Sequence, residues 1–296
     1  MAGVDFVNNG KYSDSEHELI RRAFALAEKA HAGQKRLSGE DFITHPLAVA
    51  ELLSGLNFDS ASIIAALLHD TLEDTAITSK IITDNFGADV AFLVEGVTKL
   101  KKIDYQPGIT GKSKNQYVQT LKKMFFAMAE DLRVILIKLA DRLHNMQTLQ
   151  YRLPADRERV AFETLEIYAP IAARLGMGDW KGQLEDLAFQ YAHPMEYAWL
   201  KRKIKEKHKD LARYLERTKP VVEWHLINAG IPIINIHSRA KHLYSLYQKL
   251  LRREMNMGKI YDIMAMRIIV PDIKSCYEVL GIIHAHYTPL PGLIKN

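Results

Sequence analysis

A chain of 296 residues is long enough for two domains of ordinary size, each with a core of its own. Its composition, 48% hydrophobic and 25% charged, is typical of a soluble globular protein and excludes a largely disordered chain. The net charge of +5 comes from basic residues spread along the chain, which suit a nucleic acid or anionic nucleotides equally, and no apolar stretch approaches the roughly 18 residues needed to cross a bilayer.

Residues 13–194 carry apolar side chains at intervals of three and four, a pattern that predicts six or more helices. The first helix is expected to run to Ala32, with Asp14 or Ser15 as its N-cap and Gly33 as its stop. This part of the chain is therefore predicted to be all-helical.

Two further helices follow. Pro46 fits the first turn of a helix over residues 47–53, which places His45 at its N-terminus. Asp59, or the serine after it, opens a helix over residues 61–73. Because the middle turns of this helix are apolar on every side, it is expected to be buried.

Residues 103–114 contain a proline, two glycines and several polar residues, which predicts a loop between helices and a candidate lid or regulatory element. Residues 137–150 then form a predicted helix with a polar stripe. Asp141 and Asn145 are four residues apart on it, and Thr148 follows one turn later. This stripe can face the polar residues at the end of the buried helix.

Beyond Pro194 the pattern changes to mixed helices and strands. We predict a mainly α chain, with an all-helical domain over residues 1–195 and the incomplete N-terminal part of an α/β domain with a mixed sheet over residues 196–296. The elements predicted in the second domain are helices over 197–217, 221–229, 240–253 and 273–286, the last opened by Asp272, and strands over 231–237 and 260–270.

Two histidines and two aspartates carry the strongest chemical signal. His69 and Asp70 are adjacent, His45 lies upstream and Asp141 far downstream. Two imidazoles and two carboxylates can hold one divalent ion. The single cysteine, Cys276, offers no thiolate set, which favours manganese, iron or magnesium over structural zinc. With no disulfide partner and no signal peptide at the N-terminus, a cytoplasmic protein is expected.

Two acidic residues extend this cluster. Glu73 follows His69 by four residues and Asp74 follows Asp70 by four, which would place all four on one side of one helix. Such a cluster is costly to bury without a cation. The alternative is a core hydrogen bond by His69, with salt bridges from the carboxylates to neighbours such as Arg142.

Several segments resemble a known family. The two histidines and two aspartates match the motif of the HD metal-dependent phosphohydrolases. Segments 33–36 (GQKR), 69–74 (HDTLED) and 139–146 (LADRLHNM) resemble the hydrolase domain of the bifunctional alarmone enzymes of the Rel/SpoT family. Segments 239–249 (RAKHLYSLYQK) and 260–267 (IYDIMAMR) resemble the ATP-binding motif and the magnesium-binding strand of its synthetase domain. The resemblance covers essentially the whole chain.

The resemblance implies an HD-type hydrolase domain that converts the alarmones ppGpp and pppGpp to GDP or GTP plus pyrophosphate. It implies a manganese ion held by the residues at 45, 69, 70 and 141. One member of the acidic pair, Glu73 or Asp74, is expected to orient or deprotonate the attacking water. All residues needed for hydrolysis are present in the sequence.

The resemblance also implies nucleotide contacts in the hydrolase domain. Asn145 and Thr148 are expected to contact the nucleotide, together with Ser38. Arg36 is expected to contact the purine or a phosphate. The alternative for Arg36 is a surface ion pair.

For the nucleotidyltransferase-like synthetase domain, the resemblance implies pyrophosphate transfer from ATP to GTP or GDP with Mg²⁺. The tyrosine motif and the glutamate that this reaction uses would lie beyond Asn296, so synthesis by this chain is not expected. The residues that match the ATP and Mg²⁺ sites are Arg239, Lys241, His242, Ser245, Lys249, Asp262 and Arg267.

Two other functions stay open on the residues alone. One is a general HD nucleotidase that acts on other nucleotides, and the other is a silent nucleotide sensor that binds without turnover. No membrane and no direct DNA contact is expected, whereas a longer parent protein could contact the ribosome.

Overall fold

The computed structural model describes residues 11–101, 129–260 and 263–288, together with residues 4, 122 and 124–127. The chain divides into two compact units, Met1–Ala192 and His193–Asn296, called here the N-terminal and C-terminal units. This division lies three residues before the boundary proposed from the sequence. In the described part of the chain, every helix is too short or too polar to span a lipid bilayer.

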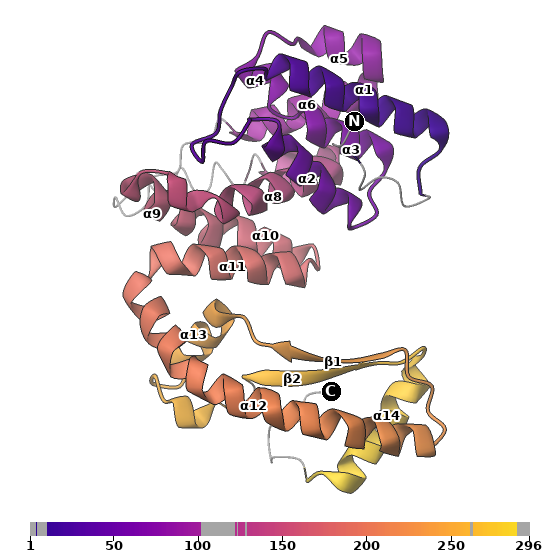
Figure 1. Ribbon diagram of the computed structural model, residues 1–296, viewed down its shortest axis with the longest axis vertical. Helices are drawn as coiled ribbons and strands as arrows, with labels where there is room; N and C mark the ends of the chain where they lie inside the picture. The colour runs from indigo at the N-terminus through magenta and orange to yellow at the C-terminus, as the bar shows by residue number, and fades with distance from the viewer. Residues whose placement is uncertain are drawn as a thin grey trace. The chain divides into compact units, whose positions relative to one another are not determined.

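The N-terminal unit is built from helices, as predicted, and α3 contacts α1, α2, α6 and α8 in its interior (Figure 1). Helices α9 and α10 each pack on α11, and α11 contacts α8. The described α-helices are α1 (Asp14–Ala30), α2 (Thr44–Ser54), α3 (Ser60–Leu68), α4 (Thr71–Asp74), α5 (Ser79–Phe86), α6 (Ala88–Lys101), α8 (Leu132–Gln147), α9 (Pro154–Glu163), α10 (Ala169–Arg174) and α11 (Gly178–Ala192), with the short helices Leu149–Tyr151 and Thr164–Tyr168 between them.

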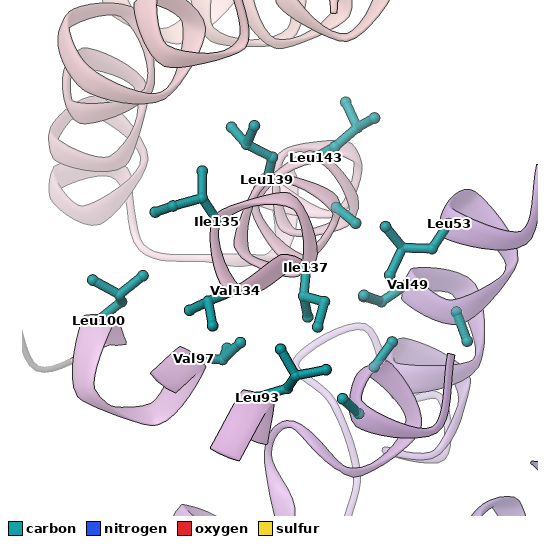
Figure 2. Close-up of a cluster of buried hydrophobic side chains, with 14 of the residues drawn as sticks. Val49, Leu53, Leu93, Val97, Leu100, Val134, Ile135, Ile137, Leu139 and Leu143 are labelled. Atoms are coloured by element: carbon teal, nitrogen blue, oxygen red, sulfur yellow. The ribbon is translucent and has the colours of Figure 1, made fainter. Parts of the chain in front are cut away.

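The apolar core holds α8 in position. Figure 2 looks along α8 and shows Val134 and Ile137 directed towards Val97 and Leu93 of α6. The two helices approach closely at Gly96, where an added Cβ atom would lie 2.8 Å from a methyl carbon of Val134. Only glycine permits this approach without displacing the side chain of Val134.

Helix α3 is buried on all sides, which confirms the prediction from its apolar sequence. The prediction of one helix over residues 61–73 was wrong, because α3 ends at Leu68 and α4 begins at Thr71. Side chains compete for the last backbone carbonyls of α3: His69 Nδ1 lies 2.8 Å from the Ala66 carbonyl and Thr71 Oγ1 donates to the Leu68 carbonyl. The break lies at the pair His69-Asp70.

The helix starts also differ from the predictions. The N-cap of α1 is Ser13, which forms a reciprocal capping box with Glu16, so neither Asp14 nor Ser15 is the cap. Helix α2 begins at Thr44, three residues before the predicted start, because the turn before it leads directly into the helix. Helix α8 begins at Leu132, five residues earlier than predicted, and the candidate loop 103–114 lies outside the described residues.

The C-terminal unit contains one long helix, α12 (Pro194–Asn228), where two were predicted. Pro220 lies inside it, and the interruption costs about 3 kcal/mol of helix stability. On the following turns Val222 and Leu226 are buried against the apolar cluster that includes Ile236. Burial of these side chains offsets the cost of the proline.

Two described strands, β1 (Asn235–Ala240) and β2 (Met264–Ile269), pair antiparallel in this unit. The strand predicted over residues 231–237 begins four residues later, because pairing with β2 defines its extent. Helices α13 (Leu243–Leu251) and α14 (Ile273–His286) follow β1 and β2 respectively, and Asp272 caps α14 as predicted. The mainly α fold class is confirmed.

Candidate metal centre and nucleotide pocket

Four buried side chains, from two helices and from the turn between two others, converge in the N-terminal unit. His45 lies in the first turn of α2, His69 and Asp70 lie between α3 and α4, and Asp141 lies in α8. Each is at most 5% exposed. His69 and Asp70 both keep a right-handed helical backbone conformation in this turn, and their side chains approach each other.

The ligand atoms of these side chains lie within the reach of one cation. Atoms of His45, His69 and Asp70 all lie within 4.8 Å of one another. Asp141 Oδ1 lies 3.2 Å from His45 Nε2 and 3.9 Å from His69 Nε2. Asp70 Oδ2 lies 3.3 Å from His69 Nε2 and 3.6 Å from His45 Nε2.

A hydrogen bond to a carbonyl of α3 fixes the tautomer of His69. Its Nδ1 lies 2.8 Å from the carbonyl of Ala66, which can only accept, so Nδ1 carries the proton and Nε2 is bare. Within the described residues no hydrogen-bond partner for this buried Nε2 atom is present. A buried nitrogen lone pair directed at two carboxylates fits a divalent cation.

The charge states around the centre also suit a cation. Burial lowers the pKa of the His45 imidazole despite the opposing charge of Asp141, which favours the neutral form. Burial alone would raise the pKa of Asp141, but Lys138 and the two imidazoles outweigh it and lower that pKa well below its ordinary value. Neutral imidazole and ionised carboxylate are the forms that bind metals.

Two residues of α8 hold the carboxylate of Asp141. Lys138 is buried and its Nζ lies 2.6 Å from Asp141 Oδ2, and Asn145 Nδ2 donates to Asp141 Oδ1.

His144, also on α8, places its Nδ1 2.7 Å from Nδ1 of His45. Burial, with the nearby His45 and Arg36, lowers the pKa of His144 to about 4. Sequence reasoning assigned no role to Lys138 or His144, although both lie three residues from Asp141 and therefore on its side of the helix.

A pocket of about 290 Å³ opens beside this cluster. Arg36 lines it, is half-buried, and donates to Thr148 Oγ1 at 3.0 Å and to Asn145 Oδ1 at 3.4 Å. Among the described residues Arg36 forms no ion pair, so the alternative of a surface ion pair finds no support there. The residues that line the pocket are Lys35, Arg36, Leu37, Ser38, Phe42, His45, Asp70, Asp74, Asp141, Asn145, Thr148, Tyr151 and Arg152.

Glu73 and Asp74, the acidic pair, lie in different surroundings. Asp74 is exposed and lines the pocket, whereas Glu73 is half-buried and does not line it. The expectation that both project from the same continuous helix as His69 was wrong, because the backbone turns between α3 and α4. Arg142 does not serve as the salt-bridge partner of this cluster, since its guanidinium pairs with Glu163 at 3.0 Å and lies 4.0 Å from the ring centre of Tyr168.

The residues predicted for the ATP site lie in the C-terminal unit. Arg239 is in β1, Lys241 and His242 precede α13, Ser245 and Lys249 are on α13, and Arg267 is exposed in β2. Lys241 is held by its backbone, which donates to the carbonyl of Ile263 at 2.9 Å. Asp262 lies outside the described residues.

Comparison with known proteins identifies two matching families. Residues 23–178 match the HD domain family, a stretch that includes all four clustered side chains. Residues 238–296 match the region found in RelA / SpoT proteins. The two matches fall in the N-terminal and C-terminal units respectively.

Curated relatives are similar along nearly the whole chain. It is 44% identical over 283 residues to the bifunctional (p)ppGpp synthase/hydrolase SpoT of Escherichia coli K12, covering 96% of this chain and 40% of that protein. It is 44% identical over 280 residues to a probable guanosine-3′,5′-bis(diphosphate) 3′-pyrophosphohydrolase of Synechocystis, covering 95% and 36%. It is 42% identical over 285 residues to a GTP pyrophosphokinase of Myxococcus xanthus, covering 96% and 37%.

The chain thus spans about two fifths of the length of these relatives. A solved structure of a metazoan orthologue of SpoT aligns with 62% of this chain and 98% of its own, at 25% identity and a TM-score of 0.45. With an HD domain followed by the region found in RelA and SpoT proteins, the chain belongs to the RelA/SpoT family.

Proposed function

We propose that the N-terminal unit hydrolyses the 3′-diphosphate of ppGpp and pppGpp, releasing GDP or GTP and pyrophosphate. The observation that carries this proposal is the buried cluster of two imidazoles and two carboxylates, with the bare Nε2 of His69 at its centre, beside a pocket with a basic wall. The names of the relatives from Escherichia coli and Synechocystis support the substrate.

The proposed cofactor is Mn²⁺, held by His45, His69, Asp70 and Asp141. The donor set of neutral nitrogen and carboxylate oxygen without sulfur supports an ion of intermediate hardness. Such an ion, when bound, supplies charge that polarises the scissile phosphate and lowers the pKa of a water molecule.

The chain's own residues then position the nucleotide and move protons. Arg36, Ser38, Asn145 and Thr148 line the pocket and bind the nucleotide in this proposal. Water adds to the phosphorus that carries O3′, the P–O3′ bond breaks, and O3′ leaves as a hydroxyl group once it receives a proton. Asp74 lines the pocket and is the better placed of the acidic pair to accept the proton of the attacking water.

A second activity, (p)ppGpp synthesis by a parent protein, is proposed for the C-terminal unit. Its match to the RelA/SpoT region, and the Myxococcus relative named GTP pyrophosphokinase, support binding of ATP with Mg²⁺ at the residues from 239 to 267. A cytoplasmic location is proposed with it, since the exposed thiol of Cys276 suits a reducing compartment.

The test is incubation of the purified chain with ppGpp and a series of divalent ions, with products identified by chromatography. Pyrophosphate and GDP are expected, with the highest rate in Mn²⁺, and Asp70→Ala is expected to abolish both metal binding and turnover. Release of orthophosphate from many nucleotides would indicate a general nucleotidase, and tight binding of ppGpp without turnover would indicate a sensor. Undiminished hydrolysis by Asp70→Ala would refute the metal centre.

A further inference from the structure

The imidazole of His45 has its two nitrogen atoms in different surroundings. Nε2 faces the carboxylates of Asp70 and Asp141. Nδ1 lies 2.7 Å from Nδ1 of His144, with the two ring centres 4.9 Å apart. Two ring nitrogens at this distance share a hydrogen bond, so one of them donates and the other accepts.

The direction of this hydrogen bond follows from the metal role of His45. A ligand nitrogen must present a bare lone pair, so if Nε2 binds the ion, the ring proton must be on Nδ1. His144 Nδ1 must then accept, and His144 carries its own proton on Nε2. His69 reaches the same tautomer through the carbonyl of Ala66, which is part of the backbone. For His45 the acceptor is a side chain and can be replaced.

We propose that His144 is a positioning residue for the metal centre. By accepting the Nδ1 proton of His45, it holds that ring in the tautomer and orientation in which Nε2 binds the ion. Helix α8 then supplies one ligand, Asp141, and three residues later orients another ligand on α2. This inference rests on the metal centre proposed above, and the experiment separates the two.

Three substitutions of His144 separate the effect of losing the hydrogen-bond acceptor from the effect of losing the ring. In His144→Asn the amide oxygen is bonded to Cγ, as Nδ1 is in histidine, so it can accept the same proton. His144→Gln moves its amide one bond further out, and His144→Phe keeps a ring without an acceptor. Loss of such a partner typically weakens metal binding by about 10- to 100-fold. We expect that loss of Mn²⁺ affinity for the Gln and Phe variants, and affinity close to that of the unsubstituted protein for Asn.

Mn²⁺ affinity is measured by competition with a chelating dye, and thermal melting of the metal-free variants checks that they fold. His225→Phe is the matched control, because this half-buried helical histidine stacks on His286 in the C-terminal unit. Asp70→Ala tests the centre itself: Mn²⁺ binding that Asp70→Ala leaves intact would overturn the centre and the inference together. Binding that is lost in Asp70→Ala but unchanged in His144→Phe and His144→Gln would overturn the inference alone.

A second measurement tests the direction of the hydrogen bond between His45 and His144 without any substitution. Imidazole ¹⁵N spectra of the protein loaded with Zn²⁺, a diamagnetic probe, report the tautomer of each ring. His45 is expected with its proton on Nδ1 and His144 with its proton on Nε2. A proton on Nδ1 of His144 would refute the proposed direction, even if the Phe variant failed to fold.

Discussion

The buried ion pair between Lys138 and Asp141, beside the metal centre, allows the contribution of one charge to stability to be measured. Lys138 Nζ lies 2.6 Å from Asp141 Oδ2, with both side chains 6–7% exposed. The lysine stem lies among apolar residues that include Ile135 and Tyr168. Lys138→Met keeps a stem of similar size in this space and removes only the charge, so the effect on packing is small.

The expected cost in Lys138→Met follows from the burial of the pair. Removal of one partner leaves the carboxylate of Asp141 in a low-dielectric site, which typically destabilises a protein by about 3–5 kcal/mol. The matched control is Lys181→Met, because Lys181 Nζ lies 3.0 Å from Glu185 Oε2 one helical turn away but is 34% exposed. Glu185 is 11% exposed, but the ammonium group of Lys181 is closer to solvent than that of Lys138, so we expect a smaller loss than for Lys138→Met.

The assay is urea unfolding of metal-free protein at several pH values. Because the folded-state pKa of Asp141 is lowered, its contribution to stability is present above about pH 4 and is lost as the pH falls through the folded-state pKa. The difference between the unsubstituted protein and Lys138→Met is therefore expected to be large at pH 7 and to shrink as the pH falls and Asp141 of the variant becomes protonated. A loss at pH 7 no larger than that of Lys181→Met would refute the reasoning.

Three further predictions test the pocket and the core. Asp74→Asn is expected to lower kcat by about 100-fold or more while Mn²⁺ affinity stays unchanged. Glu73→Gln is expected to lower kcat by a smaller factor, and equal decreases in kcat in a steady-state assay would count against the assignment of Asp74. Arg36→Ala is expected to raise KM for ppGpp roughly 10- to 100-fold, since a charge-assisted hydrogen bond is worth about 1.5–3 kcal/mol, and an unchanged KM would remove Arg36 from the nucleotide site. Gly96→Ala is expected to destabilise the fold by about 1–2 kcal/mol, because its Cβ would lie 2.8 Å from Val134. Urea unfolding should show that this loss of stability disappears in a Val134→Ala background. A loss that persists there would exclude the contact with Val134 as its cause.

Local signals in the sequence anticipated much of the fold. The apolar run of α3 predicted a helix buried on all sides, and Asp272 before an amphipathic segment predicted the start of α14. These features depend on residues within one or two turns, so the chain encodes them without reference to the rest of the protein. The motif around His69 and Asp141 indicated the family in the same way.

Competition between local signals and tertiary contacts explains the errors. The pattern continued across His69 as one helix, but side chains of His69 and Thr71 bond the carbonyls that end α3. Separate helices were predicted over 197–217 and 221–229, on either side of Pro220, but burial of Val222 and Leu226 keeps α12 continuous. In both cases the deciding interaction has a direction or a partner that residue spacing does not specify.

The sequence by itself determined which residue types are available: two imidazoles, several carboxylates and a basic segment before α2, on helices whose apolar faces it also encodes. Only the tertiary structure decided which of them meet. It places Asp74 in the lining of the pocket but not Glu73, and it brings Lys138 to Asp141 and His144 to His45. The physical reason is that hydrogen bonds and ion pairs depend on distances of a few ångströms, and these are set by the packing of α2, α3 and α8 on one another.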